Sequence, residues 1–316
     1  MADLLDRAVG GHRPSLARLL SMVERGGDEA RAVSAVVHPR SGRAATVGIT
    51  GAPGAGKSTL TSALCRSLRG DDAEVAVLAV DPSSPFTGGA ILGDRIRMGE
   101  HVLDEGVFIR SMATRGHLGG LAVAVPDAAR VLDTAGYGWV VVETVGVWQV
   151  EVDVASATDT TVVVVNPGWG DAVQAAKAGL VEIADVFVVN KADRAGAADA
   201  VRDLTAVLSL RGAADWVPPV VETVATTGRG VDRLREVLVE HRAHLLASGE
   251  LGRRRARRAE EELRAVVAAR LAERAEVLCR GDAWDAQLLA VADGSVDPWS
   301  AADAVLRAAG PSGQPA

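Results

Sequence analysis

The chain of 316 residues contains only two cysteines, Cys65 and Cys279, which lie far apart in the sequence. Two separated thiols provide neither a disulfide framework nor the closely spaced cysteines of a structural zinc site. The six histidines also form no cluster with the spacing of metal ligands. The sequence therefore lacks the side chains expected of a protein that carries nickel or cobalt.

The chain also has no excess of positive charge and no long apolar run. The formal net charge is −7 at pH 7, so the electrostatic footprint of a nucleic-acid-binding protein is missing. No apolar run reaches the ~18 residues that a membrane-spanning helix needs, and no signal peptide is recognisable at the start. We therefore expect a cytoplasmic protein with neither nucleic-acid nor membrane partners.

One glycine-rich segment carries a complete phosphate-binding pattern. Residues 51–58 read GAPGAGKS, which fits G-x-x-x-x-G-K-[ST], between an apolar run at 45–50 and a helix-competent stretch at 59–64. Backbone N–H groups of such a loop turn toward phosphate oxygens, Lys57 can reach the β- and γ-phosphates, and the Ser58 hydroxyl can bind Mg²⁺. The predicted nucleotide contacts here are Gly51, Ala52, Pro53, Gly54, Ala55, Gly56, Lys57, Ser58 and Thr59.

A second motif indicates which base is bound. Residues 190–193 read N-K-A-D and follow a buried-strand run at 186–189. The Asp193 carboxylate can accept hydrogen bonds from the guanine N1–H and exocyclic amine, a donor pair that adenine lacks. The Lys191 stem is expected to pack on the base, and Asn190 to tie this loop to the phosphate loop. The motif therefore predicts GTP and GDP as the bound nucleotides.

A further loop after the last predicted strand, residues 223–228, lies where its backbone N–H groups could touch the base. Its predicted base contacts are Thr223 and Ala225.

Acidic residues between the two motifs are candidates for binding Mg²⁺. Asp81 comes at the end of a predicted strand, where an acid can face the phosphate loop. Asp94 lies in a glycine-rich stretch, and Glu143 precedes Gly146 in a strand–acid–x–x–Gly arrangement in which Gly146 N–H could contact the γ-phosphate. The predicted metal ligands are Ser58, Asp81, Asp94 and Glu143, and the predicted catalytic residues are Lys57, Asp81, Glu143 and Gly146.

Apolar runs alternate with helical segments through the middle of the chain. Continuous valine-rich runs such as 161–165 are typical of strands buried on both faces. The pattern predicts an α/β, P-loop NTPase fold with a mostly parallel central sheet flanked by helices, and with helical extensions at both ends. The expected strands are 45–50, 75–80, 107–110, 139–142, 161–165, 186–189 and 220–224.

We expect four regions: an N-terminal helical extension (1–43), a GTPase domain (44–240), a C-terminal helical dimerisation arm (241–309) and a disordered tail (310–316). The first region shows two helical patterns, over residues 2–9 and from Pro14 onward.

Charged and histidine residues mark the start of the arm. The arginines in 253–258 precede three glutamates, 260–262, and we expect a solvated face that pairs with neighbouring acids. His241 and His244, at helical i, i+3 spacing, are also expected on a solvated face. An apolar stripe then comprises Leu263, Val266, Val267, Leu271, Ala275 and Leu278.

Taken together, these motifs resemble the MeaB/ArgK-type GTPases, whose human counterpart acts in methylmalonic aciduria type A. The similarity covers roughly residues 10–290, and the run RSMATRGHLGG at 110–120 is its most specific part. The other stretches that carry it are 51–59, 80–85, 88–98, 143–146, 170–177 and 190–193.

The resemblance implies a slow GTPase, stimulated by its partner, that acts as a chaperone of the adenosylcobalamin enzyme methylmalonyl-CoA mutase. It would gate cofactor loading and protect or reactivate the mutase, and it would be a homodimer. Residues 170–177 align with the switch that couples the nucleotide to the mutase. The coupling residues implied by that alignment are Asp171, Gln174 and Lys177.

Trp148 departs from the family pattern, which has glycine at this position. The added bulk beside the expected γ-phosphate sensor bears on hydrolysis more than on nucleotide binding. Three alternatives therefore remain open: a metallochaperone-type GTPase, a nucleotide-binding interaction protein with little hydrolysis, and an ATP-using kinase of amino-acid transport.

Overall fold

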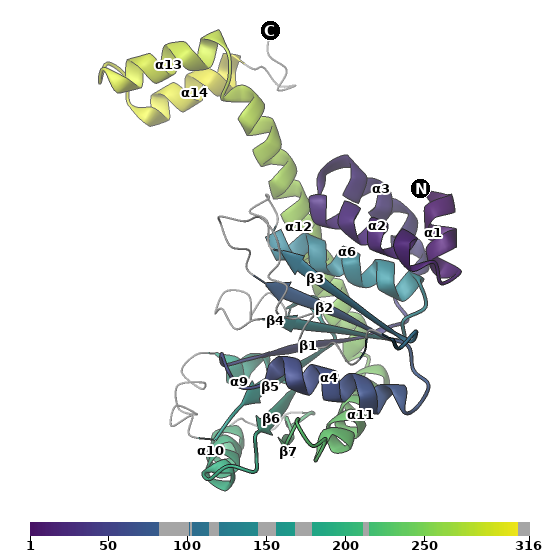
Figure 1. Ribbon diagram of the computed structural model, residues 1–316. Helices are drawn as coiled ribbons and strands as arrows, with labels where there is room; N and C mark the ends of the chain where they lie inside the picture. Colours follow the sequence, from purple (N-terminus) through teal and green to yellow (C-terminus); the bar gives the residue numbers. More distant parts are fainter. Residues whose placement is uncertain are drawn as a thin grey trace. The chain divides into compact units, whose positions relative to one another are not determined.

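The computed structural model describes residues 1–81, 101, 103–113, 120–144, 156–167, 179–210 and 215–308. Within these residues a seven-stranded, all-parallel sheet has the strand order β3-β2-β4-β1-β5-β6-β7 (Figure 1). The strands are β1 (Ala45–Gly51), β2 (Val75–Asp81), β3 (Val107–Ala113), β4 (Trp139–Thr144), β5 (Thr160–Val165), β6 (Val186–Asn190) and β7 (Val220–Thr223).

The sheet is buried on both faces, as its valine-rich strands require. Every residue of β5 and β6 is buried, and β4 is buried from Val140 onward. Side chains that alternate along a strand enter different hydrophobic clusters, for example Val163 and Val164. The prediction of a parallel α/β sheet flanked by helices is therefore confirmed, with all seven expected strands present.

Helices cover each face of this sheet. On one face, α4 (Lys57–Arg69) and α11 (Val231–Ala247) bury Leu64 and Leu234 against β1, β2, β4, β5 and β6. The other face is covered over β2, β3 and β4 by the N-terminal helices and α6, and over β5 and β6 by α9 and α10 (Figure 1). These helices are α1 (Ala2–Val9), α2 (Arg13–Arg25), α3 (Gly27–Val37), α6 (Gly120–Thr134), α9 (Leu180–Ile183) and α10 (Ala197–Ser209).

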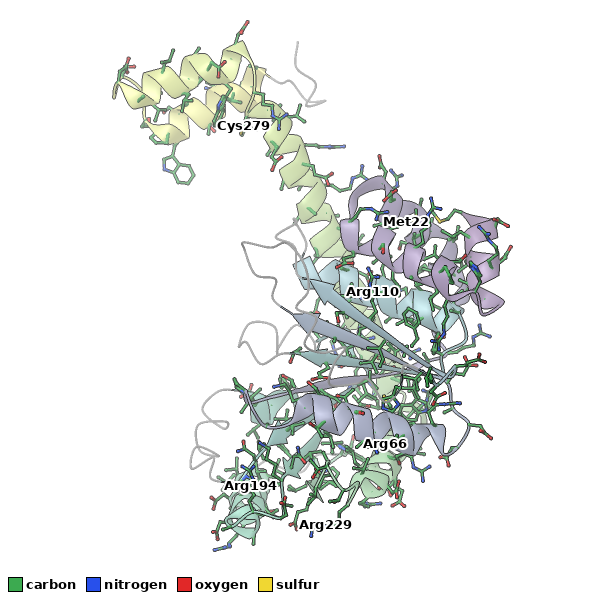
Figure 2. All side chains as sticks on the ribbon, viewed as in Figure 1. Met22, Arg66, Arg110, Arg194, Arg229 and Cys279 are labelled. Carbon is green, nitrogen blue, oxygen red and sulfur yellow. The ribbon has the colours of Figure 1, made fainter. Side chains whose placement is uncertain are left out.

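The N-terminal helices are tied to the sheet by polar contacts as well as by packing. Arg110 of β3, labelled in Figure 2, donates hydrogen bonds to Ser21 Oγ (3.0 Å) and to Glu24 Oε2 (2.8 Å) of α2. A short 3-10 helix, His38–Arg40, then leads to the segment 42–44 before β1.

The segment 42–44 has all its backbone groups bound. The Asp133 carboxylate accepts hydrogen bonds from all three N–H groups, and Arg242 and Arg255 donate to the three carbonyl oxygens. A buried backbone group left without a partner costs about 1–3 kcal/mol. These contacts therefore fix where β1, and with it the phosphate loop, begins.

The remaining residues form a second compact unit that starts at Glu261. The long helix α12 (Glu250–Leu278) spans the boundary between the units, and α13 (Asp282–Ala292) packs against α14 (Pro298–Ala308). Ala301 and Val305 are buried in α14, whereas α12 and α13 have no buried residue. Apolar side chains of the expected stripe are exposed on α12, among them Leu263 (65%), Val267 (50%) and Leu271 (59%).

Helix α3 was not indicated by the sequence, which showed two helical patterns before residue 43. It follows Gly26 and Gly27, both with positive φ, and buries only Val33 and Val37. Because its apolar stripe is this short, no periodic pattern reveals it.

The expectation that His241 lies on a solvated face is wrong. Its side chain is 0% exposed, its Nδ1 lies 2.9 Å from Thr160 Oγ1, and its ring centre lies 4.7 Å from that of Trp216. Burial lowers the pKa of His241 to about 4, despite the nearby Asp185 carboxylate, so the ring is neutral at pH 7.

The basic run of α12 is only partly the solvated face that the sequence suggested. Arg253 and Arg257 pair with the neighbouring Glu250, as expected. The other three arginines bind buried acids far away in the sequence, which precede β5 and β6. These pairs are Arg254–Asp185, Arg255–Asp159 and Arg258–Asp159.

Candidate nucleotide-binding site

The predicted nucleotide residues gather at the edge of the sheet where the parallel strands end. β1 leads into the loop 51–58 and lies between β4, which carries Glu143, and β5. β6 ends at Asn190 and β7 at Thr223. Ligands of open parallel sheets bind at this edge, because loops from neighbouring strands converge there. Strand order thus brings together motifs that lie far apart in the sequence.

The phosphate loop adopts a conformation that depends on glycine. Gly56 has φ +90°, and a Cβ atom placed on it would lie 2.5 Å from Asn190 Nδ2. Helix α4 begins at the next residue, Lys57, so its free N–H groups face the loop. The Lys57 side chain is 6% exposed, and its Nζ donates to the carbonyl oxygens of Gly51 (2.7 Å) and Ala52 (3.1 Å). The loop therefore encloses a buried positive charge.

Two of the predicted metal ligands are in direct contact. Ser58 Oγ donates a hydrogen bond of 2.5 Å to Glu143 Oε1, and both residues are buried. A hydroxyl and a carboxylate are hard oxygen donors of the kind that Mg²⁺ prefers. Since Mg²⁺ usually keeps several waters and takes only one or two carboxylates from a protein, this pair fits a magnesium site next to the phosphates.

Asn190 joins the phosphate loop to the loop after β7. Its Nδ2 donates to the Ala55 carbonyl oxygen (2.8 Å), and its Oδ1 accepts from Thr223 Oγ1 (3.1 Å) and from the Ala225 N–H (3.2 Å). Asn190 is 2% exposed, so these bonds are shielded from water. The side chain thus holds three separate loops at fixed positions. The Ala225 N–H is used within this network.

Lys191 and Asp193 differ from Asn190 in having accessible side chains. Lys191 has φ +58°, and its Nζ donates to the Gly54 carbonyl oxygen (2.7 Å), so its stem lies across the loop. Asp193 is exposed and makes no hydrogen bond or ion pair with any described residue. A carboxylate without a partner at this edge is available to a ligand that offers two N–H donors.

Several predicted residues lie outside the described part of the chain. They include the metal ligand Asp94, the γ-phosphate sensor Gly146, Trp148 and the three coupling residues. Asp81 is described only in its backbone, at the end of β2. The coupling residues are Asp171, Gln174 and Lys177.

Sequence reasoning missed a pair of threonines beneath the site. Thr144 Oγ1 donates to Thr50 Oγ1 (3.3 Å), and both side chains are fully buried at the ends of β4 and β1. The bond joins the strand of Glu143 to the strand that carries the phosphate loop. The one available signal was a hydroxyl residue at the end of each apolar run.

A phosphate loop on the central strand of a parallel sheet, bonded through Asn190 to an N-K-x-D loop, defines the class of P-loop GTPases. The chain belongs to the MeaB family: the family model described as methylmalonyl Co-A mutase-associated GTPase MeaB matches residues 16–278. The resemblance noted from the motifs is therefore confirmed.

Related proteins agree with this assignment. A relative from Pyrococcus abyssi that also carries the name of a GTPase is 48% identical over 309 residues, covering 96% of this chain and 95% of its own. The GTPase ArgK of Escherichia coli is 37% identical and covers 84% of this chain and 82% of its own. A crystal structure of an LAO/AO transport system kinase superposes with a TM-score of 0.69 at 28% identity, covering 97% and 96% of the two chains.

Two searches of the described residues bear on the alternatives. They contain no group of three or more His, Cys, Asp or Glu side chains placed to hold a metal ion. No helix among them is long and apolar enough to cross a membrane.

Proposed function

We propose that this chain binds GTP with Mg²⁺ and hydrolyses it to GDP and phosphate. The observation that carries the proposal is the Asn190 side chain, which joins the phosphate loop to the loop after β7 and leaves Asp193 free beside them. A nucleotide with a base near Asp193 and phosphates over Lys57 would bridge the two halves of this network. Membership of a GTPase family supports the same reading.

The residues divide into three roles. The N–H groups of the loop 51–58 and the Lys57 ammonium bind the phosphates and offset their negative charge as it shifts during transfer. Ser58 and Glu143 would hold Mg²⁺, assisted by Asp81 and Asp94, and the ion would neutralise phosphate charge. Asp193, Lys191 and the loop of Thr223 and Ala225 would select guanine. Gly146 N–H would sense the γ-phosphate.

The proposed biological role is that of a chaperone for methylmalonyl-CoA mutase. The family description supports association with that enzyme. We propose that GTP binding and hydrolysis gate adenosylcobalamin loading and protect or reactivate the mutase, with Asp171, Gln174 and Lys177 coupling the two proteins. A slow intrinsic rate that rises with the partner, and a cytoplasmic location, belong to the same proposal.

A homodimer formed through the arm, residues 241–309, is also part of the proposal. Support comes from the exposed apolar side chains of α12, which monomeric soluble proteins rarely gather on one helix. We propose that the tail 310–316 stays disordered.

Co-purification with the mutase tests this role. A tagged chain is incubated with purified mutase in GDP and in a slowly hydrolysed GTP analogue, and the retained mutase is quantified. We expect retention that differs between the two nucleotides, because a switch needs different contact energies in its two states. Equal retention in both, or none in either, contradicts the coupling. The metallochaperone alternative has no support among the described residues, since no ligand cluster is present there.

A further inference from the structure

A cavity of about 330 Å³ lies at the opposite edge of the sheet from the nucleotide site. Glu74, Glu105 and Tyr137 line it, and they precede β2, β3 and β4, so they stand at the amino ends of these strands. Its other wall comes from the turn between α1 and α2, including Arg13 and Leu16. Volumes from ~300 Å³ upward are typical of small-molecule sites.

Tyr137 is the most informative residue of this cavity. It is 7% exposed, and its ring centre lies 6.0 Å from that of Phe108. Its hydroxyl makes no hydrogen bond with any residue that the structure describes. Buried tyrosine hydroxyls normally have a partner, because leaving one unpaired costs about 1–3 kcal/mol. The hydroxyl is therefore available to a ligand in the cavity.

The charges around the cavity favour a positively charged ligand. Arg13 is the one cation in the lining, and its Nη2 already donates to the carbonyl oxygens of Asp104 (3.0 Å), Glu105 (2.8 Å) and Val107 (2.8 Å). The carboxylates of Glu74 and Glu105 form no printed ion pair and are exposed at the rim. The lining thus has two free acids and one largely occupied base.

We propose that this cavity is a second ligand site, which takes a small organic cation: a primary amine or guanidinium on a short apolar stem. The cationic group binds between the Glu74 and Glu105 carboxylates, and its N–H donates to the Tyr137 hydroxyl oxygen. The stem packs on Val9 and Leu16. The site does not depend on the nucleotide site, since it shares no residue with it.

The chain contains a single tyrosine, so one spectroscopic signal reports this cavity alone. The full-length protein is labelled with tyrosine carrying ¹³C at Cζ, and its one Cζ resonance is followed at low salt. The probes are four-carbon molecules of matched length: putrescine (cationic), 1,4-butanediol (neutral) and succinate (anionic). We expect putrescine alone to shift the resonance in a saturable way, with half-saturation below about 5 mM.

Variants separate this site from general attraction to an acidic protein. Glu74→Gln with Glu105→Gln should weaken putrescine binding at least fivefold. Asp203→Asn, which removes an exposed acid from α10, should leave it unchanged. Tyr137→Phe should melt no lower than the parent, because the hydroxyl has no partner to lose, but the rise in its melting temperature with putrescine should at least halve.

Three results would overturn the proposal. One is the absence of a saturable shift up to about 20 mM putrescine, which would indicate a cavity filled only by water. Another is an equal response to butanediol or succinate, which would remove the cationic class. The last is equal loss of binding in Asp203→Asn and in the double variant, which would show that the effect is non-specific.

Discussion

Asn190 and Asp193 belong to one four-residue motif but are placed in opposite ways. Asn190 is buried and makes hydrogen bonds to three loops, whereas Asp193 is exposed and unbonded. A residue that builds the site must be satisfied before the ligand arrives. A residue that selects the ligand must have an open valence that only the correct base fills. The motif therefore combines one structural and one selective side chain.

Changing Asp193 should alter selectivity and leave the fold intact. We expect Asp193→Asn to weaken GTP binding at least about tenfold, or ~1.4 kcal/mol, and to shift preference toward xanthosine nucleotides. Calorimetric titration with GDP, GTP and their xanthosine analogues measures this. Asp203→Asn is the matched control. Unchanged GTP affinity in Asp193→Asn would show that another group reads the base.

The two cysteines should differ sharply in reactivity. Burial raises the pKa of the Cys65 thiol to about 12, helped by the nearby Glu143 carboxylate, whereas Cys279 is exposed (Figure 2). Because the thiolate is the reactive form, a native protein should release about one equivalent of chromophore with Ellman's reagent, and about two after unfolding. Cys279→Ser should abolish the native signal. Rapid reaction of both thiols in the native state would contradict the burial of Cys65.

At the scale of elements, the start of α12 is joined to the sheet through charge. Arg254 makes two hydrogen bonds to the Asp185 carboxylate, at 2.8 and 2.9 Å, and Asp185 also accepts from the Thr161 N–H (2.8 Å). The buried ring of His241 lies against the same acid. Helices α11 and α12 thus meet the strands that lead to the phosphate and guanine loops at their amino ends.

Removing one partner of this contact should be costly. Arg254→Ala would leave the buried Asp185 carboxylate without its cation, and we expect a loss of about 3 kcal/mol in the free energy of unfolding. Arg253→Ala, on the same helix but paired with Glu250 on the surface, should cost no more than about 0.5 kcal/mol. Urea denaturation of both variants provides the comparison. Similar losses in the two would show that the buried pair is not special.

The neutral His241 ring should make stability depend on pH. Its pKa is lowered in the fold, so the unfolded chain binds the extra proton, and stability is lost as pH falls from about 6.5 toward 4. The parent should lose up to about 3 kcal/mol more than His241→Gln between pH 7 and pH 4. Urea melts of both proteins across this range measure the difference. Parallel pH profiles would mean that the ring is protonated without cost.

At the scale of the whole molecule, the chain has a first unit with its own core and a second unit with little core of its own. The three large hydrophobic clusters lie within residues 5–238, whereas the second unit buries little more than Ala301 and Val305. The exposed apolar residues of α12 and α13 are the surface on which the proposed dimer depends.

Truncation after Glu260 tests that division. We expect residues 1–260 to remain folded and to bind GDP within about threefold of the full chain, under ~0.7 kcal/mol, but to be monomeric. Light scattering of both chains measures the assembly, and circular dichroism checks the fold. A truncated chain that is still dimeric would place the interface in the first unit.

The sequence predicted this molecule well where patterns are local. Valine-rich runs located every strand, and the two loop motifs located the edge where nucleotide binds, because each depends on neighbouring residues. The burial of His241 and the pairing of Arg254 with Asp185 were not predictable in this way. Both depend on partners 69 to 81 residues distant, for which charge pattern and helical spacing carry no signal. Helix α3 was missed because only two of its residues are buried.

Single-turnover phosphate release is the most direct test of the proposed activity. The full-length chain, in excess over trace GTP or ATP with Mg²⁺, is compared with Lys57→Ala and with Arg66→Ala, which changes an exposed cation on the same helix. We expect GTP to be hydrolysed at least about 100-fold faster than ATP, equivalent to ~2.7 kcal/mol. Lys57→Ala should remove most of that activity, and Arg66→Ala should keep it. Equal rates with GTP and ATP, or parental GTP hydrolysis by Lys57→Ala, would contradict a guanine-specific GTPase with its centre at this loop.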